Sequence, residues 1–424
     1  MKKFRMTKQY LNLGFAIIII GILAGMGANA LGYVLSITEK LFLNFHENSK
    51  MPVSMLIKPE HRLISVFVGA MLASIIWYFL HKKYHLTSVN EAMEGKKMSV
   101  KATVLTDLTQ SFYIGTGGSV GREAAPRELA AMISQKIGDF SIFKFDKEDI
   151  QLLIAAAAGA GLAAQYVAPL SGTVFSILLL HRVYNKKNIV VSLSMSLIAT
   201  LVGSLREGFK PYYIVKTSDF NWNCLPLLII LGLVLGFVGW KYKGIINYAK
   251  YKKLTNKKVL FMLPCAGLLT GIISIFCPYI MGNGRGITQL AYNTNNLDLD
   301  MIMTLCVCLL MKAFITVFTI YSGAYGGILT PSISIGAVSG ILIGFIYNSI
   351  FFSNISLISC ALFGSVGFLT ATQQSLLLGI VLIVELCHIN TNILLGFMVV
   401  AFVAINVPGL CMHLKASYKT LFRV

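Results

Sequence analysis

The segment Ile114–Ala130, IGTGGSVGREAAPRELA, places four charged side chains directly after a cluster of glycines. These are Arg122, Glu123, Arg127 and Glu128, and the chain on both sides of them is strongly apolar. A charge at membrane depth costs several kcal/mol unless it is paired or lines a water-filled path. The segment is therefore either a surface loop or a polar path inside a membrane protein.

The composition indicates a membrane protein. Of the 424 residues, 56% are hydrophobic and only 12% are charged, whereas a soluble chain carries about twice that charged fraction. Several apolar runs approach or exceed the roughly 20 residues that cross a bilayer as a helix. The chain is predicted to be an all-α polytopic membrane protein. The runs are Leu11–Ile37, Leu63–Leu80, Leu225–Trp240, Val259–Ile280, Leu357–Leu386 and Ile393–Val407.

The net charge of +19 comes from Lys and Arg in short connections between the apolar runs. Cytoplasmic loops of membrane proteins carry such an excess, so a nucleic-acid partner is not predicted. Both ends of the chain are basic, which predicts a protein of the cell membrane with both termini in the cytoplasm. Ala28–Ala30 resembles a secretory cleavage site, but the apolar run continues to Ile37, which favours a retained first span.

The cysteines and histidines show no metal-binding pattern. All eight cysteines follow residue 220, most of them in or beside apolar runs and without a C-x-x-C pair. They are interpreted as small core residues rather than disulfides or ligands. The seven histidines form no H-E-x-x-H motif, so no metal and no cofactor are predicted.

Two segments of the chain echo each other. GSVGREAAP (Gly118–Pro126) and GAYGGILTP (Gly323–Pro331) are each a glycine-rich turn that ends in proline, and each is followed by apolar and small-residue spans. Transporters are often built from such repeats, with the substrate site at the repeat interface. We predict one membrane repeat in residues 1–215, a second in residues 216–424, and no soluble regulatory domain.

Each turn is predicted to open a helix, because proline suits a first helical turn. A helix N-terminus presents unpaired N–H groups and a partial positive charge, which favour an anion. Two such ends that converge at mid-membrane would form an anion site without a buried cation. The carboxylate of Glu123 would compete with the anion, and its protonation would release it, which makes the residue a gate and a proton acceptor. On the pattern alone, a structural Glu123 paired with Arg122 or Arg127 at a loop surface is equally open.

Four stretches resemble the CLC family of chloride channels and chloride/proton antiporters: GREAAP, ELAAMIS, AAAAGAGLAAQYVAPLSGTVF and SGAYGGILTPSISIGAVSG. The resemblance runs from about Leu11 to Val424. Ala124 and Ala125 replace the Gly and Pro of the first family motif, and Leu329 replaces the Phe of the second. The chain is therefore identified as an atypical member.

The resemblance implies an inverted repeat of tilted and partly spanning helices, and a homodimer with one anion pathway per subunit. It makes Glu123 the external gate. Near the C-terminus, Tyr418 matches a tyrosine whose hydroxyl can donate to the anion, although an aromatic at the membrane interface is the alternative. The residues whose backbone N–H groups would line the anion sites are Arg122, Glu123, Ala124, Ile328, Leu329 and Thr330.

The serine motif that the family uses at the inner end of the pathway is not recognisable. The matching region is Lys83–Met93, KYHLTSVNEAM, and alignment places Tyr84 or His85 at the serine position. Ser88 is the nearest serine, but a helix N-cap is the favoured interpretation for it.

Other departures concern charged positions. The internal glutamate of proton-coupled members falls at Leu179, while His181 and Arg182 are expected to mark the end of that helix. Lys312 matches a basic family position whose counterpart in the first repeat is lost. Glu385, late in the chain, is interpreted as a structural cap or ion-pair partner.

The sequence thus predicts transmembrane anion transport, with chloride as the default ion, through a pathway gated by Glu123. The retained glutamate favours a proton-linked exchanger, and Leu179 favours a passive channel. Fluoride, nitrate or bicarbonate are alternative ions. An enzyme is not predicted, because no nucleophile or metal cluster accompanies Glu123, and an organic solute would need a more polar cavity.

Overall fold

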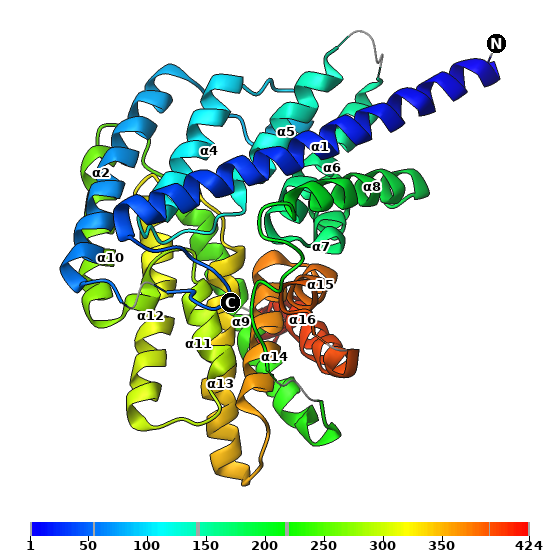
Figure 1. The fold of residues 1–424 in the computed structure, drawn as a ribbon. Helices are drawn as coiled ribbons and strands as arrows, with labels where there is room; N and C mark the ends of the chain where they lie inside the picture. The colour runs from blue at the N-terminus through cyan, green and yellow to red at the C-terminus, as the bar shows by residue number, and fades with distance from the viewer. Residues whose placement is uncertain (1, 54–55, 141–144, 217–219, 390, 423–424) are drawn as a thin grey trace.

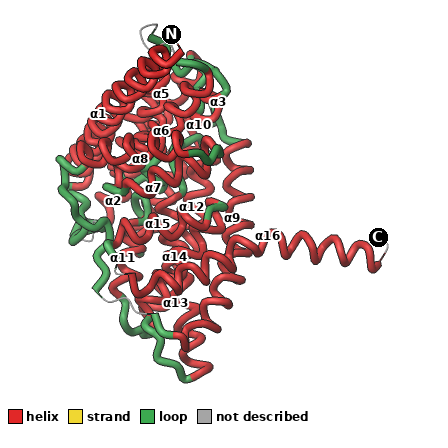
Figure 2. Tube along the Cα trace, turned by 90° about the vertical axis from the view of Figure 1, so that its right-hand side faces the viewer, coloured by secondary structure: helices red, strands yellow, loops and turns green. Residues whose placement is uncertain are grey.

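The computed structural model describes the chain except residues 1, 54–55, 141–144, 217–219, 390 and 423–424, and it describes side chains within residues 11–412. The described residues form helices joined by loops and contain no strand (Figures 1 and 2). This agrees with the all-α prediction.

The first part of the chain contains α1 (Lys2–Leu43), α2 (Pro59–Lys83), α3 (Val89–Met93), α4 (Val100–Gly115), α5 (Ala124–Gly138), α6 (Lys147–Tyr166), α7 (Pro169–Val174), the π-helix η1 (Phe175–His181) and α8 (Lys186–Gly203). The second part contains η2 (Trp222–Cys224), α9 (Leu225–Tyr251), α10 (Val259–Phe276), η3 (Pro278–Ile280), α11 (Arg285–Asn293), α12 (Leu299–Tyr321), α13 (Leu329–Phe351), α14 (Leu357–Gln373), α15 (Leu376–Cys387), η4 (Thr391–Ile393) and α16 (Leu394–Phe422).

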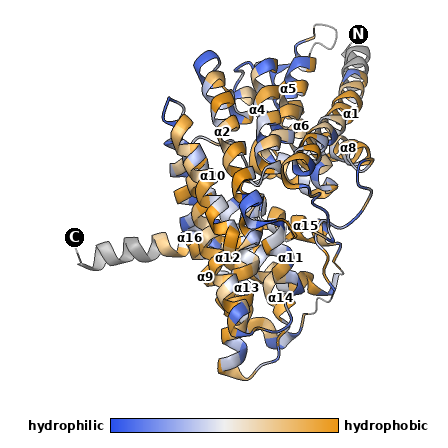
Figure 3. Ribbon diagram, turned by 60° about the vertical axis from the view of Figure 1, so that its left-hand side comes forward, coloured by the Kyte–Doolittle hydropathy of each residue, from blue (hydrophilic) through white to orange (hydrophobic). Residues whose placement is uncertain are grey.

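Within the described residues, eight helices are long and apolar enough to cross a membrane: α1, α2, α8, α9, α10, α12, α13 and α16. Figure 3 shows hydrophobic residues along these helices and hydrophilic residues concentrated in the connections. The predicted polytopic architecture is confirmed. α1 continues without a break through Ala28–Ala30 and lies across α4, α5 and α6 (Figure 1).

One predicted span is wrong as a single helix. The apolar run Leu357–Leu386 divides into α14 and α15, and each is too short to cross a bilayer alone. Gln374 adopts a left-handed conformation (φ 55°) that ends α14. The Ser375 hydroxyl accepts the Leu378 N–H at 3.3 Å and starts α15. This division into two short helices agrees with the partly spanning helices that the family resemblance implies.

Glycines bring the central helices into backbone contact. A Cβ on Gly161 of α6 would lie 2.1 Å from the carbonyl oxygen of Pro126, in the first turn of α5. A Cβ on Gly340 of α13 would lie 2.1 Å from the Cys360 carbonyl of α14. Small residues allow such close approach between membrane helices. Gly161 thereby holds α5 in place, and Gly340 holds α13 in place. These are the two helices that begin at the glycine-rich turns.

Glu385 caps a helix, as the sequence predicts. Its carboxylate on α15 accepts the N–H groups of Leu170 (2.9 Å) and Ser171 (2.7 Å), and the Ser171 hydroxyl at 2.5 Å. These donors lie at the N-terminus of α7, where N–H groups lack partners within the helix.

Replacing Glu385 with alanine is expected to destabilise the protein by about 1–3 kcal/mol, because polar groups at the start of α7 lose their acceptor. Thermal or denaturant unfolding in detergent micelles measures the effect. Glu94→Ala, which removes an exposed carboxylate at the end of α3, is the matched control. Equal stability of the two variants would contradict the cap.

Candidate functional site

The two glycine-rich turns lie side by side at the centre of the molecule. Gly121 and Gly327 form an antiparallel bridge, in which the Gly121 N–H donates to the Gly327 carbonyl (2.9 Å) and the Gly327 N–H donates back (2.8 Å). α5 begins at Ala124 and α13 begins at Leu329, directly after these turns. The expected convergence of two helix starts is therefore present in the structure.

Buried polar side chains hold the first turn in place. The Gln110 amide on α4 donates to the Gly121 carbonyl at 3.1 Å. The fully buried Lys312 ammonium on α12 donates to the Ser119 hydroxyl (2.8 Å) and to the Gly282 carbonyl (2.6 Å). Lys312, which matches a basic position of the family, thus anchors the turn that leads into α5.

The Glu123 side chain crosses from one helix start to the other. Glu123 is fully buried and stands directly before α5, yet its Oε1 accepts the N–H of Leu329 in the first turn of α13, at 2.6 Å. The hydroxyls of Thr330 and Tyr166 each lie 3.4 Å from its Oε2. An N–H donor to a carboxylate at a helix N-terminus is a strong, charge-assisted arrangement. The carboxylate occupies a place that suits an anion.

Glycine is required on both turns because the carboxylate lies against them. A Cβ on Gly327 would lie 1.8 Å from Glu123 Oε1, and a Cβ on Gly121 would lie 2.4 Å from Oε2. Any other residue at either position would collide with the carboxylate. The glycines therefore serve close approach of a side chain as well as the turn itself.

The interpretation of Glu123 as a surface residue paired with a neighbouring arginine is wrong. Arg127 donates from Nε to the backbone carbonyl of Glu123 at 2.9 Å. Arg122 instead faces Glu47, with 3.5 Å between Nη1 and Oε1. The Glu123 carboxylate is instead fully buried among backbone and hydroxyl donors.

The turns bring together the six residues whose backbone N–H groups are predicted to line the anion sites. Five of them are buried: Arg122, Glu123, Ala124, Leu329 and Thr330; Ile328 is partly exposed. The Leu329 N–H already has the carboxylate as acceptor, and Thr330 adds a hydroxyl.

Among the described side chains, Tyr166 contacts the Glu123 carboxylate, and the sequence analysis did not single it out. Its hydroxyl lies 3.4 Å from the Glu123 carboxylate and 3.5 Å from the Thr330 hydroxyl. Tyr166 is the last residue of α6, a helix that is otherwise rich in Ala and Gly. A single aromatic hydroxyl at the end of such a helix is the sequence signal that could have indicated its role. The predicted Tyr418 lies in α16, outside the described side chains.

Two of the inner candidates face a cavity and one does not. Tyr84 and His85 line a cavity of about 590 Å³ together with His81 and Tyr325, and the Tyr325 hydroxyl lies 3.2 Å from His81 Nε2. Ser88 is exposed; its hydroxyl accepts the Glu91 N–H and, with the Glu91 side chain, forms a capping box at the start of α3. The N-cap interpretation of Ser88 is confirmed.

All eight cysteines are free thiols, and five of them are buried in the core. Among the described residues, no group of three or more His, Cys, Asp and Glu side chains is placed to hold a metal ion. The chemistry available at the site is therefore that of backbone N–H groups, hydroxyls and one carboxylate.

A bundle of apolar helices, with two helix starts meeting around a buried carboxylate, is the architecture of a helical membrane transporter. Residues 69–409 match the model of the family described as "Voltage gated chloride channel". The chain belongs to this family, the CLC family of anion transport proteins.

Curated relatives are similar over most of their length. The "Voltage-gated ClC-type chloride channel ClcB" of Escherichia coli O17:K52:H18 is 26% identical over 336 residues, which cover 77% of this chain and 78% of the relative. The protein of the same name from Salmonella typhimurium is 26% identical over 343 residues, covering 78% and 80%.

Solved structures share the fold. A slow cyanobacterial Cl⁻/H⁺ antiporter superposes with a TM-score of 0.78 at 20% identity, covering 93% of this chain and 94% of the other. A CLC-type fluoride/proton antiporter superposes with a TM-score of 0.67 at 18% identity and the same coverage.

Proposed function

We propose that the protein exchanges an inorganic anion, chloride by default, for protons across a cell membrane, and that Glu123 is the gate. The observation that carries this proposal is the Glu123 carboxylate on the Leu329 N–H. A carboxylate held by the donors of a second helix start stands where a passing anion would bind.

The coupling of anion and proton movement follows because the Glu123 carboxylate and the anion compete for the same binding site. While Glu123 is charged, it holds the N–H of Leu329 and excludes the anion. Protonation removes its charge and about half of the hydrogen-bond attraction to the helix start, because charge-assisted hydrogen bonds are about twice as strong as neutral ones. The anion then takes the site. After the anion leaves, the carboxylic acid of Glu123 loses its proton and returns to the site as the carboxylate. A protein that alternates between these states moves anions and protons in a fixed ratio.

The proton needs an inner route, and Leu179 supplies none. Leu179 lies in η1, where it packs against the apolar core. Glu128, on α5 more than one turn beyond Glu123, is the acid we propose for this step. It is only partly exposed, and burial acts most strongly on its carboxyl group, followed by the opposing charges of Arg127 and Lys253.

We infer that Glu128 communicates with the inner cavity through Lys253 and Tyr325. The Lys253 ammonium lies 2.9 Å from the centroid of the Tyr325 ring, and Tyr325 lines the 590 Å³ cavity. Asp107 on α4, fully buried with no hydrogen bond to either carboxyl oxygen, lies within electrostatic reach of Glu128. Ionisable groups inside a membrane protein often mark proton relays.

Replacing Glu128 with glutamine is expected to lower proton flux about 10- to 100-fold, because the inner side loses its proton acceptor. Anion flux should fall less. Glu148→Gln, at an exposed position in the first turn of α6, is the matched control. Proton flux equal to that of the control would remove Glu128 from the route.

A passive anion channel is the second candidate, and the apolar Leu179 favours it. The ion is also a proposal: the missing inner serine motif and Leu329 distinguish this pathway from the family pattern, so fluoride, nitrate and bicarbonate belong in the same test.

The deciding experiment uses the full chain in liposomes loaded with each anion, with anion efflux and pH recorded together. An exchanger moves protons against their gradient when the anion gradient drives it. Anion efflux without proton movement identifies a channel, and the absence of flux for every ion overturns the proposal.

We also propose that the chain forms a homodimer with both termini in the cytoplasm and with repeats in residues 1–215 and 216–424. The face formed by α7, α15 and α16 supports the dimer, because it is hollowed and exposes large apolar side chains. Its exposed residues include Leu170, Leu377, Met398 and Phe402. The mass of the detergent-solubilised protein tests this assembly.

A further inference from the structure

A basic cavity of about 640 Å³ lies beside the gate. Tyr166, whose hydroxyl lies 3.4 Å from Glu123, lines it. Its charged lining is mostly positive and consists of Lys50, Arg122, Arg206, Glu207, Lys210 and Arg285.

The positive field of this cavity acts on its one acid. Burial opposes ionisation of Glu207, but the charges of Arg206, Arg122 and Arg285 outweigh burial and lower the pKa of its carboxyl group. Glu207 forms an ion pair with Arg206. The guanidinium groups of Arg122 and Arg285 pair with a different carboxylate, that of Glu47.

Two buried guanidinium groups meet at the ring of Tyr212. The Cζ atoms of Arg285 and Arg122 lie 3.9 and 4.7 Å from the ring centroid, and the two residues are only 2% and 8% exposed. A cation over an aromatic ring is stabilised more strongly when it is shielded from water. The cluster is therefore preformed and does not depend on surface side chains.

One carboxylate is shared by these two cations. Glu47 Oε1 lies 3.0 Å from Arg285 Nη1 and 3.5 Å from Arg122 Nη1. Arg285 is also held by the Tyr212 carbonyl and the Ser49 hydroxyl. The buried Nε of Arg122 has no hydrogen-bond partner. The cluster thus carries one positive charge in excess and one N–H donor without an acceptor.

We propose that Arg122 and Arg285 form a second, outer anion site, in which the Glu47 carboxylate stands in for a small inorganic anion. An anion that enters the cavity displaces Glu47, binds between the guanidinium groups and then continues to Glu123. This inference rests on the proposed transport function, and it adds a second competing carboxylate to the pathway.

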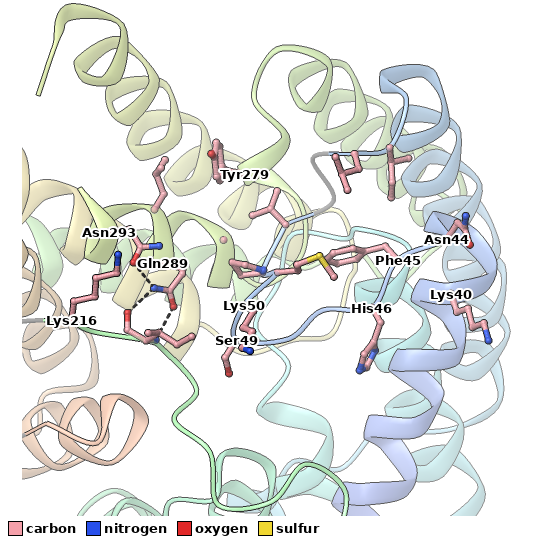
Figure 4. A pocket seen from close by; sticks show the side chains of 18 residues that line it. Lys40, Asn44, Phe45, His46, Ser49, Lys50, Lys216, Tyr279, Gln289 and Asn293 are labelled. Atoms are coloured by element: carbon pink, nitrogen blue, oxygen red, sulfur yellow. Dashed lines mark hydrogen bonds between the residues drawn. The ribbon is translucent and has the colours of Figure 1, made fainter. Parts of the chain in front are cut away.

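The position of Glu47 suits a displaceable group. It lies between α1 and α2, outside both helices, and its N–H donates to the Glu39 carboxylate at 3.0 Å. Figure 4 shows Phe45, His46, Ser49 and Lys50 of the same connection around a further cavity of about 1050 Å³. His46, Ser49 and Lys50 line both cavities. The connection that carries Glu47 therefore borders both cavities and is not enclosed by helices on every side.

The test is a bromide soak of crystals of the full-length protein, with anomalous diffraction. In the Glu47→Gln variant, bromide density is expected between Arg122 and Arg285, because the competing charge is gone. Glu207→Gln removes an acid from the same cavity but leaves Glu47 in place, so it should show no bromide there. No density in Glu47→Gln, or bromide beside an undisplaced Glu47 in the unmodified protein, would overturn the proposal.

Flux through liposomes separates this inference from the transport function. In Glu47→Gln, the apparent KM for chloride on the cavity side is expected to fall about five-fold, which is about 1 kcal/mol. Arg285→Gln, a second variant in case the first does not fold, should raise that KM. Transport with an unchanged KM in the variants overturns the outer site alone, whereas absence of flux in the unmodified protein overturns the proposed function.

Discussion

Glu123→Gln is expected to abolish proton movement and to leave anion flux equal or higher. Glutamine keeps the size of the side chain but has no carboxylate to bind a proton, so proton flux should fall at least about 100-fold. The amide also loses the charge that holds Glu123 on the Leu329 N–H at 2.6 Å, so the anion meets a weaker competitor. Simultaneous anion and pH recording in liposomes measures both quantities.

The matched control is Glu94→Gln, at an exposed position beyond the end of α3. It should keep the anion-to-proton ratio of the unmodified protein. If Glu123→Gln still pumps protons at the control rate, Glu123 is not the proton acceptor, and its buried carboxylate before α5 has only a structural role.

The centre of the fold could be predicted from the sequence because its signals are local. Glycines mark both turns and prolines mark both helix starts, so two anion-favouring helix ends follow from short stretches of chain. Even the partner of Glu385 was predictable in kind, since an acid at the end of an apolar run needs donors. Ser88 was predictable for the same reason, because a serine three residues before Glu91 is a capping pattern.

The side chains that complete the site come from distant segments and carry no local signature. Tyr166 reaches Glu123 only because α6 packs against α5 through Gly161. Glu47 forms an ion pair with Arg285, which lies in the opposite half of the sequence. No spacing between residues in the sequence predicts this pair. The break between α14 and α15 could not be predicted, because the polar residues from Thr372 to Ser375 are a short interruption in a long apolar run.

Gly327→Ala is expected to uncouple the protein much as Glu123→Gln does. A Cβ at this position would lie 1.8 Å from Glu123 Oε1, and the bridge to Gly121 prevents the backbone from moving away. The carboxylate must then leave the Leu329 N–H, so proton flux should fall at least about ten-fold while the anion path stays open. Gly244→Ala, with no neighbouring atom within 4 Å of its Cβ, is the matched control.

A double-mutant cycle decides whether the Gly327→Ala effect acts through the gate. In a Glu123→Ala background the colliding carboxylate is absent, so adding Gly327→Ala should change the anion flux no further. Residues in direct contact show such non-additivity, whereas independent sites add. If the two substitutions were additive, the alanine would be disturbing the start of α13 itself, and the close fit between glycine and carboxylate would have no part in gating.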